Sequence, residues 1–182
     1  MSWIKEITRE ENEELKRIYE DAEKRTKEKT ANVLTVHSIR PKVLNIHMAL
    51  YELIMFGEGV LSRAQREMIG VVVSSANQCP YCVGHHGEAL YHVTENKELM
   101  EKIARNYLEA DLNEVDLAIC DYAFKLTKTS YKMTEADIIE FRNLGLNDET
   151  IFDINQITAY FNYVNRIVHG LGVELEEGKK VL

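Results

Sequence analysis

The sequence has few of the residues that interrupt helices: two prolines, Pro41 and Pro80, and nine glycines in 182 residues. So few turn-forming residues favour long helices over a meander of short strands. Basic clusters are also lacking, and the formal net charge is −8. Because a nucleic-acid surface needs a cationic patch, the composition argues against a general nucleic-acid partner.

Long apolar runs are absent as well. The longest uncharged stretch, 68–84, contains Ser, Asn, Gln and Pro, and it is too short and polar to span a bilayer. The N-terminal segment turns acidic where the apolar part of a secretory signal would begin. With 45% hydrophobic residues and an odd number of cysteines, we expect a cytoplasmic protein with one domain over 1–182 and no membrane partner.

Capping patterns mark several helix starts. They are typical of an all-α bundle, and they occur at Thr8, Ser62, Asn113, Thr134 and Asn147. Helices are also predicted over 41–56 and 96–107. The expected organisation is N-terminal helices in 1–57, a central motif region in 58–108 and C-terminal helices in 109–182.

One stretch, IGVVVSS at 69–75, is β-branched like a strand. No second run of comparable quality could pair with it, so a buried helix is predicted. The segments 61–77 and 146–162 align without a gap, each starting with Leu and a capping residue and ending in Asn. This similarity suggests an internal duplication.

The stretch NQCPYCVGHHGEAL, residues 77–90, combines two of three cysteines with two of six histidines. With the proline in the first helical turn, where its missing N–H costs little, a helix is predicted to begin near Cys79. At about 100° per residue, Cys79 and Cys82 share one face and His86 falls between them in projection. His85 points away from Cys79, so His86 is the imidazole expected to reach a thiol.

A cysteine is a nucleophile only when it is ionised. A helix N-terminus and a nearby imidazolium both stabilise the thiolate. Two cysteines spaced i and i+3 can also form a disulfide, so that one is oxidised and the other resolves it. The stretch alone therefore favours a peroxide-reducing or thiol-exchange centre.

Three other kinds of site fit the sequence less well. A zinc site made of Cys79, Cys82 and a histidine needs a fourth ligand, and Cys120 stands alone in an apolar segment as an expected buried side chain. Haem attachment needs His directly after the second cysteine, where Val83 stands. A glutaredoxin needs a strand before its motif and a later cis-proline, but no proline follows Pro80. We therefore expect no metal and no cofactor.

Several other polar residues receive no active role. His37 and Arg40 are expected to hold a turn, and the three histidines without an evident partner are His47, His92 and His169. The charged tail, 174–182, is expected to be solvated or docked on a neighbouring subunit.

The segment REMIGVVVSSANQCPYCVGHH, residues 66–86, resembles the signature of the alkylhydroperoxidase AhpD-like family, within the carboxymuconolactone decarboxylase superfamily. Glu67, Cys79, Cys82 and His86 match its reactive positions at every spacing. MSWI at the start, HSIRP at 37–41 and FNYVNRIVHGLGV at 161–173 resemble the subgroup called peroxidase-related, so the resemblance covers nearly the whole chain. Carboxymuconolactone decarboxylases proper lack the cysteine pair, so their activity is not implied.

The resemblance implies an all-helical subunit that assembles into trimers or hexamers. It implies that Cys82 is the peroxidatic cysteine, that Cys79 is its partner, and that Glu67 and His86 form a proton relay. The implied substrate is a hydroperoxide, and the implied reductant is an external dithiol, a thioredoxin or a lipoyl-type group.

One position departs from the family pattern. AhpD has a histidine between its cysteines where this chain has Tyr81, and a phenol ionises far above neutral pH. The relay would then be shorter or differently connected, with Tyr81 and His85 as auxiliary candidates. The alternative function is a non-enzymatic helical oligomer whose cysteine pair senses redox state or binds a metal.

Overall fold

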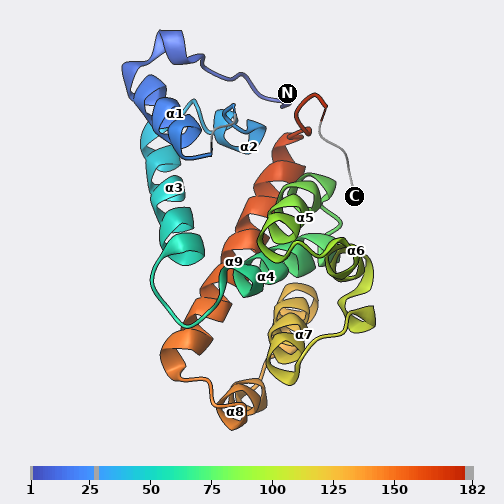
Figure 1. Cartoon of the computed structure of the whole chain (residues 1–182). Helices are drawn as coiled ribbons and strands as arrows, with labels where there is room; N and C mark the ends of the chain where they lie inside the picture. Colours follow the sequence, from blue (N-terminus) through green and yellow to red (C-terminus); the bar gives the residue numbers. More distant parts are fainter. Residues whose placement is uncertain (1, 27–28, 179–182) are drawn as a thin grey trace.

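A computed structural model describes residues 2–26 and 29–178 (Figure 1). Within these residues the chain forms helices and no strands. The α-helices are α1 (Glu13–Thr26), α2 (Asn32–Thr35), α3 (Pro41–Phe56), α4 (Arg63–Ala76), α5 (Pro80–Thr94), α6 (Lys97–Asn106), α7 (Glu114–Thr129), α8 (Glu135–Asn143) and α9 (Asp148–Leu171). Short 3₁₀ turns cover Arg9–Glu11, Tyr107–Glu109 and Ser130–Lys132. The predicted all-α fold is confirmed.

Helix α4 occupies the centre of the molecule. It packs against α5, α7 and α9, and nearly all of its side chains from Arg66 to Ser74 are buried. Its β-branched run, which lowers helix propensity, includes Val71, Val72 and Val73. A helix surrounded by other helices needs apolar side chains all round, and this explains the strand-like composition. The predicted buried helix is confirmed.

The predicted caps explain where most helices start. The Ser62 hydroxyl accepts from the Gln65 amide while the Gln65 side chain accepts from the Ser62 amide, so the predicted capping box is present. The prediction at Thr8 was wrong in extent, because only a 3₁₀ turn follows it and α1 begins at Glu13. There Asn12 accepts from two amides and caps the start of α1.

The two similar segments lie side by side. They form α4 and the first part of α9, which pack against each other. Their terminal residues meet, because the Asn77 side chain donates to the Asn162 side chain over 3.0 Å. An internal duplication and an oligomeric assembly both stay predictions.

The N-terminal segment lies against the end of α9. The Trp3 amide donates to the Leu171 carbonyl over 2.8 Å, and Gly172 follows with φ of 61°. A β-carbon at Gly172 would come within 2.1 Å of the Trp3 indole, so this turn requires glycine. The N-terminal segment is thereby fixed at the end of α9, where the chain leaves that helix (Figure 1).

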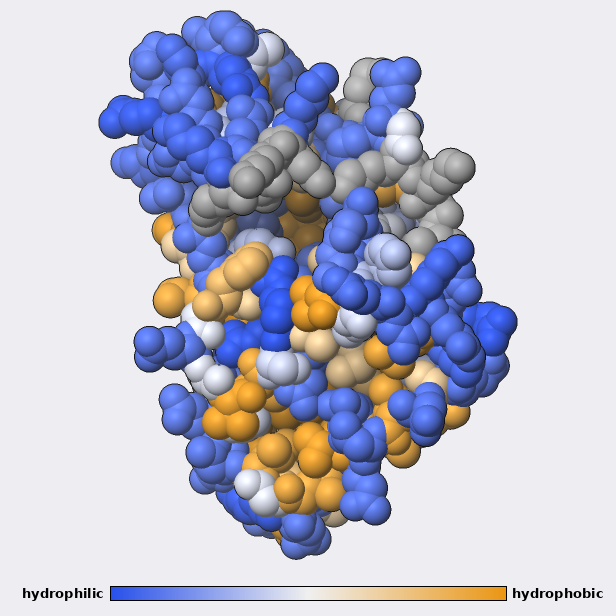
Figure 2. Space-filling model, viewed as in Figure 1, coloured by the Kyte–Doolittle hydropathy of each residue, from blue (hydrophilic) through white to orange (hydrophobic). Residues whose placement is uncertain are grey.

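The outer surface is mixed in character. Hydrophilic side chains cover α1, while apolar side chains gather at α3 and near α7 and α8 (Figure 2). Across the described part of the chain, no helix combines the length and apolar character needed to cross a membrane.

Candidate active site

The cysteine pair lies where α4 turns into α5. Gln78 takes φ of 56° in this turn, and the Cys79 amide donates to the Ser74 carbonyl over 2.9 Å. Cys79 is the residue before the first helical turn and Pro80 is the first residue of α5, so the predicted helix start is confirmed. Both thiols are free, and the residues are 0% and 2% exposed.

The two thiols differ in their affinity for a proton. A hydrogen bond from Cys82 lowers the pKa of Cys79 to about 6, against the effect of burial, and the Cys82 amide and His169 lower it further. The same thiol–thiol hydrogen bond, together with burial, raises the pKa of Cys82. The pair therefore favours a thiolate on Cys79 that accepts a hydrogen bond from the Cys82 thiol.

Polar side chains of α4 and α9 surround Cys82. Asn165 and Ser74 both hydrogen-bond to its sulfur and favour its ionised form. The Asn165 amide in turn donates to Ser74 over 3.2 Å, and its oxygen accepts from Asn77 over 2.9 Å. A buried sulfur anion at this position would therefore have hydrogen-bond donors.

Glu67 and His86 are in direct contact. His86 Nδ1 lies 2.7 Å from Glu67 Oε2, and the Glu67 side chain is 0% exposed. Its other oxygen accepts from the guanidinium of Arg63, which also donates to the Met55 carbonyl over 3.0 Å. A carboxylate removed from water needs such partners, and Arg63 supplies the compensating charge.

The His86 ring packs between α4 and α9. Its ring meets that of Phe161 edge-on at 4.4 Å, and a β-carbon at Gly70 would lie 3.0 Å from Phe161 and 3.4 Å from His86. Glycine at position 70 therefore lets the imidazole approach α4. Because His86 follows Cys82 by four residues on α5, the two side chains share one helical face.

Tyr81 and His85 belong to a different cluster. His85 Nε2 lies 2.8 Å from one oxygen of Glu176, and the Tyr81 hydroxyl donates to the other over 2.8 Å. The rings of Tyr81 and His85 contact each other at 4.6 Å. The structure thus places both auxiliary candidates away from the Glu67–His86 contact.

The tail differs from its prediction at Glu176, whereas Glu174, Glu177 and Gly178 are exposed as expected, and residues 179–182 lie outside the described residues. The half-buried Glu176 is held by its own chain, because it also accepts from the Asn32 amide over 2.7 Å. Although burial raises its pKa, hydrogen bonds from His85, Asn32 and Tyr81 lower the pKa of Glu176 to about 2. The carboxylate of Glu176 therefore holds the tail against its own chain.

Sequence reasoning missed several residues of the site. Arg63 stands four residues before Glu67, a helical spacing that was available as a signal. Asn165 and His169 come from α9, far along the chain, and no local pattern indicates them. Cys120 is buried, as expected, and burial raises its pKa.

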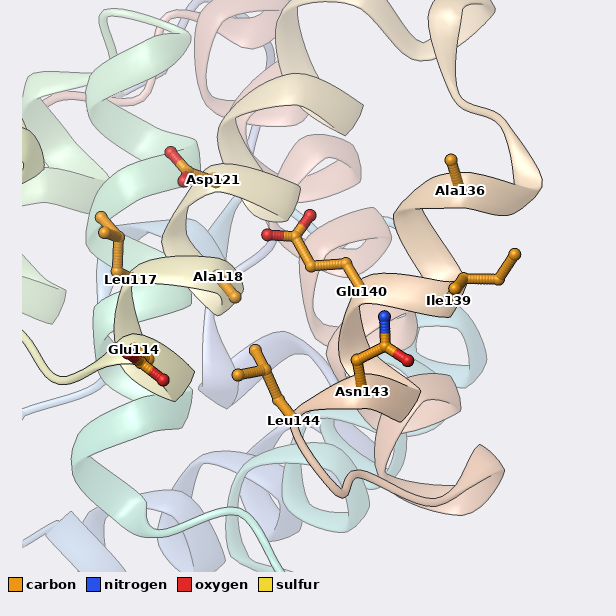
Figure 3. A pocket seen from close by; sticks show the side chains of 9 residues that line it. All are labelled: Glu114, Leu117, Ala118, Asp121, Ala136, Ile139, Glu140, Asn143 and Leu144. Carbon is orange, nitrogen blue, oxygen red and sulfur yellow. The ribbon is translucent and has the colours of Figure 1, made fainter.

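Two hollows flank the helices at different distances from the thiols. The larger, about 470 Å³, lies between α7 and α8, and Figure 3 shows its three carboxylates, Glu114, Asp121 and Glu140, around an apolar floor. None of the predicted site residues lines it. The smaller, about 250 Å³, reaches Cys79 and is bordered by Gln78 and Arg105.

Metal ligation has little support in the geometry. Within 2–26 and 29–178, no three His, Cys, Asp or Glu side chains are arranged to hold a metal ion.

Comparison with known proteins gives one family and one fold. The family model of the carboxymuconolactone decarboxylase family matches residues 41–111. The structure of an uncharacterized peroxidase-related protein from Silicibacter sp. TM1040 is 33% identical over 92% of this chain and 87% of its own, with a TM-score of 0.87. A peroxidase-related protein from Ralstonia eutropha JMP134, described as an alkylhydroperoxidase AhpD core, is 30% identical over 97% and 93%, with a TM-score of 0.89.

A more distant structure shares the fold. The debrominase Bmp8, in complex with 2,3,4-tribromopyrrole, is 16% identical over 97% of this chain and 95% of its own, with a TM-score of 0.82. At this identity the similarity shows the fold alone. No curated protein matches the chain at a significant level.

Proposed function

Because this chain belongs to the AhpD-like family of the carboxymuconolactone decarboxylase superfamily, in its peroxidase-related subgroup, we propose that it is a thiol-dependent peroxidase. The observation that carries the proposal is the 2.7 Å contact between the buried Glu67 and His86, four residues beyond Cys82. Relatives on this fold include enzymes of other activities, a debrominase among them, so the reaction needs its own argument.

The proposed reaction starts at Cys82. Its sulfur attacks the outer oxygen of a hydroperoxide, the O–O bond breaks, and the products are a sulfenic acid and an alcohol. In the resting pair Cys79 is the thiolate and Cys82 is the thiol that donates a hydrogen bond to it, so the proton of Cys82 moves to Cys79 as the Cys82 sulfur forms its bond to oxygen. Cys79 then attacks the sulfenic sulfur, water leaves, and a disulfide forms.

The Glu67–His86 relay supplies a proton to the departing oxygen. Since a carboxylate only accepts, the His86 Nδ1–H donates to Glu67, and Nε2 is the ring atom available to the reacting groups. A protonated Nε2 can give its proton to the leaving alkoxide, which makes O–O cleavage easier. Glu67 fixes the orientation of the ring, and Arg63 acts as a positioning residue for Glu67.

Reduction of the disulfide requires an external dithiol. Its first thiolate attacks one sulfur, its second releases the mixed disulfide, and the two cysteines leave as thiols. The hollow of about 250 Å³ that reaches Cys79 supports attack from that side. The same proposal includes a thioredoxin or lipoyl-type group as the external dithiol, a cytoplasmic location, and a trimeric or hexameric assembly.

Anaerobic titration with a hydroperoxide, with thiol counting, tests this function. The wild type should lose two thiols rapidly, and Cys79→Ser should trap a sulfenic acid on Cys82. His86→Ala should slow the first step by about 100-fold, the size expected for loss of a general acid.

The same experiment can reject the enzyme. Slow oxidation that His86→Ala leaves unchanged would support the non-enzymatic redox sensor. Stoichiometric zinc in the purified protein would support a metal site.

A further inference from the structure

A series of asparagine side chains joins the surface of α9 to the buried Cys82. Asn162 and Asn165 lie on α9, and Asn77, the residue after α4, bridges them. The Asn77 side-chain nitrogen donates to the Asn162 oxygen over 3.0 Å and to the Asn165 oxygen over 2.9 Å. Asn165 is 1% exposed and hydrogen-bonds to the Cys82 sulfur, so it forms the buried end of the series.

The outer end of the series fixes the orientation of the Asn162 amide. A main-chain carbonyl only accepts hydrogen bonds, and a guanidinium only donates them. The Asn162 nitrogen donates to the Thr158 carbonyl over 3.0 Å, and its oxygen accepts from the Arg166 guanidinium over 3.0 Å. A flipped amide would place two acceptors together and two donors together. The oxygen that meets Asn77 is therefore assigned by groups whose roles cannot change.

Each inner amide takes its orientation from the one before it. Because Asn77 meets the oxygen of Asn162, it presents its nitrogen, and the same nitrogen donates to the Asn165 oxygen. The nitrogen of Asn165 is thereby turned to the opposite side, where it donates to the Ser74 hydroxyl over 3.2 Å and lies against Cys82. The group that Asn165 directs at the sulfur is thus a donor and not an acceptor.

The charge on Cys82 changes during reduction of the disulfide. In the resting pair, Cys82 is a thiol that donates to the Cys79 thiolate. Once an external thiol is bonded to Cys79, that sulfur carries no charge, and Cys82 departs as an anion. Its hydrogen bonds with Asn165 and Ser74 do not depend on the state of Cys79. Because a hydrogen bond to a charged acceptor is stronger than one to a neutral acceptor, the Asn165 donor contributes most at this step.

We propose that Asn165 is a further catalytic residue, whose amide nitrogen donates to the Cys82 sulfur as that sulfur leaves during reduction of the disulfide. The proposal rests on the thiol chemistry of the proposed function and adds a residue to its reductive half. The thiolate of a dithiol attacks the Cys79 sulfur, the bond between the two cysteine sulfurs breaks, and its electron pair goes to Cys82. The second thiol gives its proton to Cys82 and attacks the mixed disulfide. Cys79 is released, and the dithiol is oxidised to a disulfide.

Reduction of the preformed disulfide by dithiothreitol tests this residue without any peroxide. The disulfide would be formed with diamide. In Asn165→Leu, which has no donor, the rate constant for reduction should fall by at least about tenfold, the size expected when a hydrogen bond to a charged group is lost. Asn165→Asp keeps the shape of the side chain and its bond from Asn77, but it should be slower still, because a carboxylate only accepts. A purely structural role predicts the reverse order, since Asp fits the site better than Leu.

Asn155→Leu is the matched control. Asn155 lies earlier on α9, where its amide donates to the Tyr122 hydroxyl over 2.9 Å. This variant should be reduced at a rate within about twofold of the wild type. A loss in Asn165→Leu no larger than this, or an Asn165→Asp protein that is reduced faster than Asn165→Leu, would overturn the proposal. Should Asn165→Leu not fold, Asn165→Asp is compared with Asn155→Asp, and equal rates would overturn it.

The pH dependence of Cys82 oxidation separates the donor from the partner thiol. In a Cys79→Ala background, dilute hydrogen peroxide oxidises the Cys82 thiolate, and dimedone traps the sulfenic acid for mass spectrometry. Adding Asn165→Leu should raise the midpoint of the rate profile by about one pH unit or more, because the anion loses a donor. An unchanged midpoint would overturn the proposal. The substitution keeps the other titratable groups around the cysteine pair, which are His86 with Glu67, Tyr81, Tyr160 and His169.

The two proposals fail separately. A protein without peroxidase activity whose disulfide reduction depends on Asn165 would refute the peroxidase and keep the catalytic residue. Rapid oxidation by a hydroperoxide, together with a reduction rate that Asn165→Leu leaves unchanged, would keep the peroxidase and refute the residue.

Discussion

His85 and His86 are neighbours on α5, and each contacts a carboxylate from a distant part of the chain. His86 Nδ1 lies 2.7 Å from Glu67, and His85 Nε2 lies 2.8 Å from Glu176. The local chemistry is the same, but the surroundings differ. The Glu67 side chain is 0% exposed and the Glu176 side chain is 22% exposed.

The elements that carry the carboxylates explain the difference. Glu67 stands on α4, the central helix, and is also paired with Arg63. Glu176 stands in the tail after α9 and joins that tail to Asn32 and to α5. Because adjacent residues on a helix point about 100° apart, one dipeptide can serve the proposed reaction through His86 and hold the tail through His85.

Replacement of the two carboxylates should give the largest contrast. Glu67→Gln should slow oxidation of the cysteine pair by at least about 100-fold, because an amide orients the imidazole poorly and leaves Arg63 without a counter-charge. Glu176→Gln is the matched control and should stay within about threefold of wild type. Stopped-flow measurement of the rate of thiol loss checks both variants. Equal decreases in rate would show that the two carboxylates do not differ in function.

The pKa of the Cys79 thiol should depend on Cys82 and not on Glu176. Absorbance of the thiolate at 240 nm should titrate with a midpoint near pH 6 in the wild type, from the pKa of Cys79, and equally in Glu176→Gln. Cys82→Ala removes the hydrogen bond that contributes most to this lowering, so its midpoint should rise by more than one pH unit. A midpoint that does not change in Cys82→Ala would contradict the shared proton.

The tail should respond to the other carboxylate. Glu176→Gln should lower the free energy of unfolding by about 1–2 kcal/mol at pH 7, because it removes a charge from three hydrogen bonds. The pKa of Glu176 falls to about 2 in the folded chain from about 4.3 when unfolded. The difference from wild type is therefore complete above pH 5 and narrows as the pH falls toward 2. Urea denaturation at pH 7 and pH 3 measures it, and a difference independent of pH would argue against the ionised contact.

His169 should have the smallest effect. It contributes less than Cys82 to lowering the pKa of Cys79, so His169→Asn should raise the 240 nm midpoint by less than Cys82→Ala does. A larger shift in His169→Asn would make the histidine the main stabiliser of the thiolate.

Much of the fold was predictable because its signals are local. Ser62 and Gln65 form their box within one helical turn, and Cys79 with Pro80 marks the start of α5. The contact between Glu67 and His86, 19 residues apart, agrees with the spacing that the resemblance supplied. Each of these depends on short spacings along one or two adjacent helices.

The contacts that were missed join distant segments. Asn165 meets Ser74 across 91 residues, and Glu176 meets His85 across 91 residues. The sequence of a charged tail is the same whether its carboxylates face solvent or accept hydrogen bonds from the protein. Only the packing of α9 against α4 and α5 distinguishes the two cases. The orientation of the Asn165 amide is likewise a property of packing.

The central claim is that Glu67 acts on Cys82 through His86, and a double-mutant cycle tests it most directly. The rate constant for the first oxidation step would be measured in wild type, Glu67→Gln, His86→Ala and the double variant. The account predicts that the double variant is about as slow as His86→Ala alone, because Glu67 has no effect once the imidazole is gone. Losses that multiply in the double variant would show that the two residues act independently and would contradict the relay.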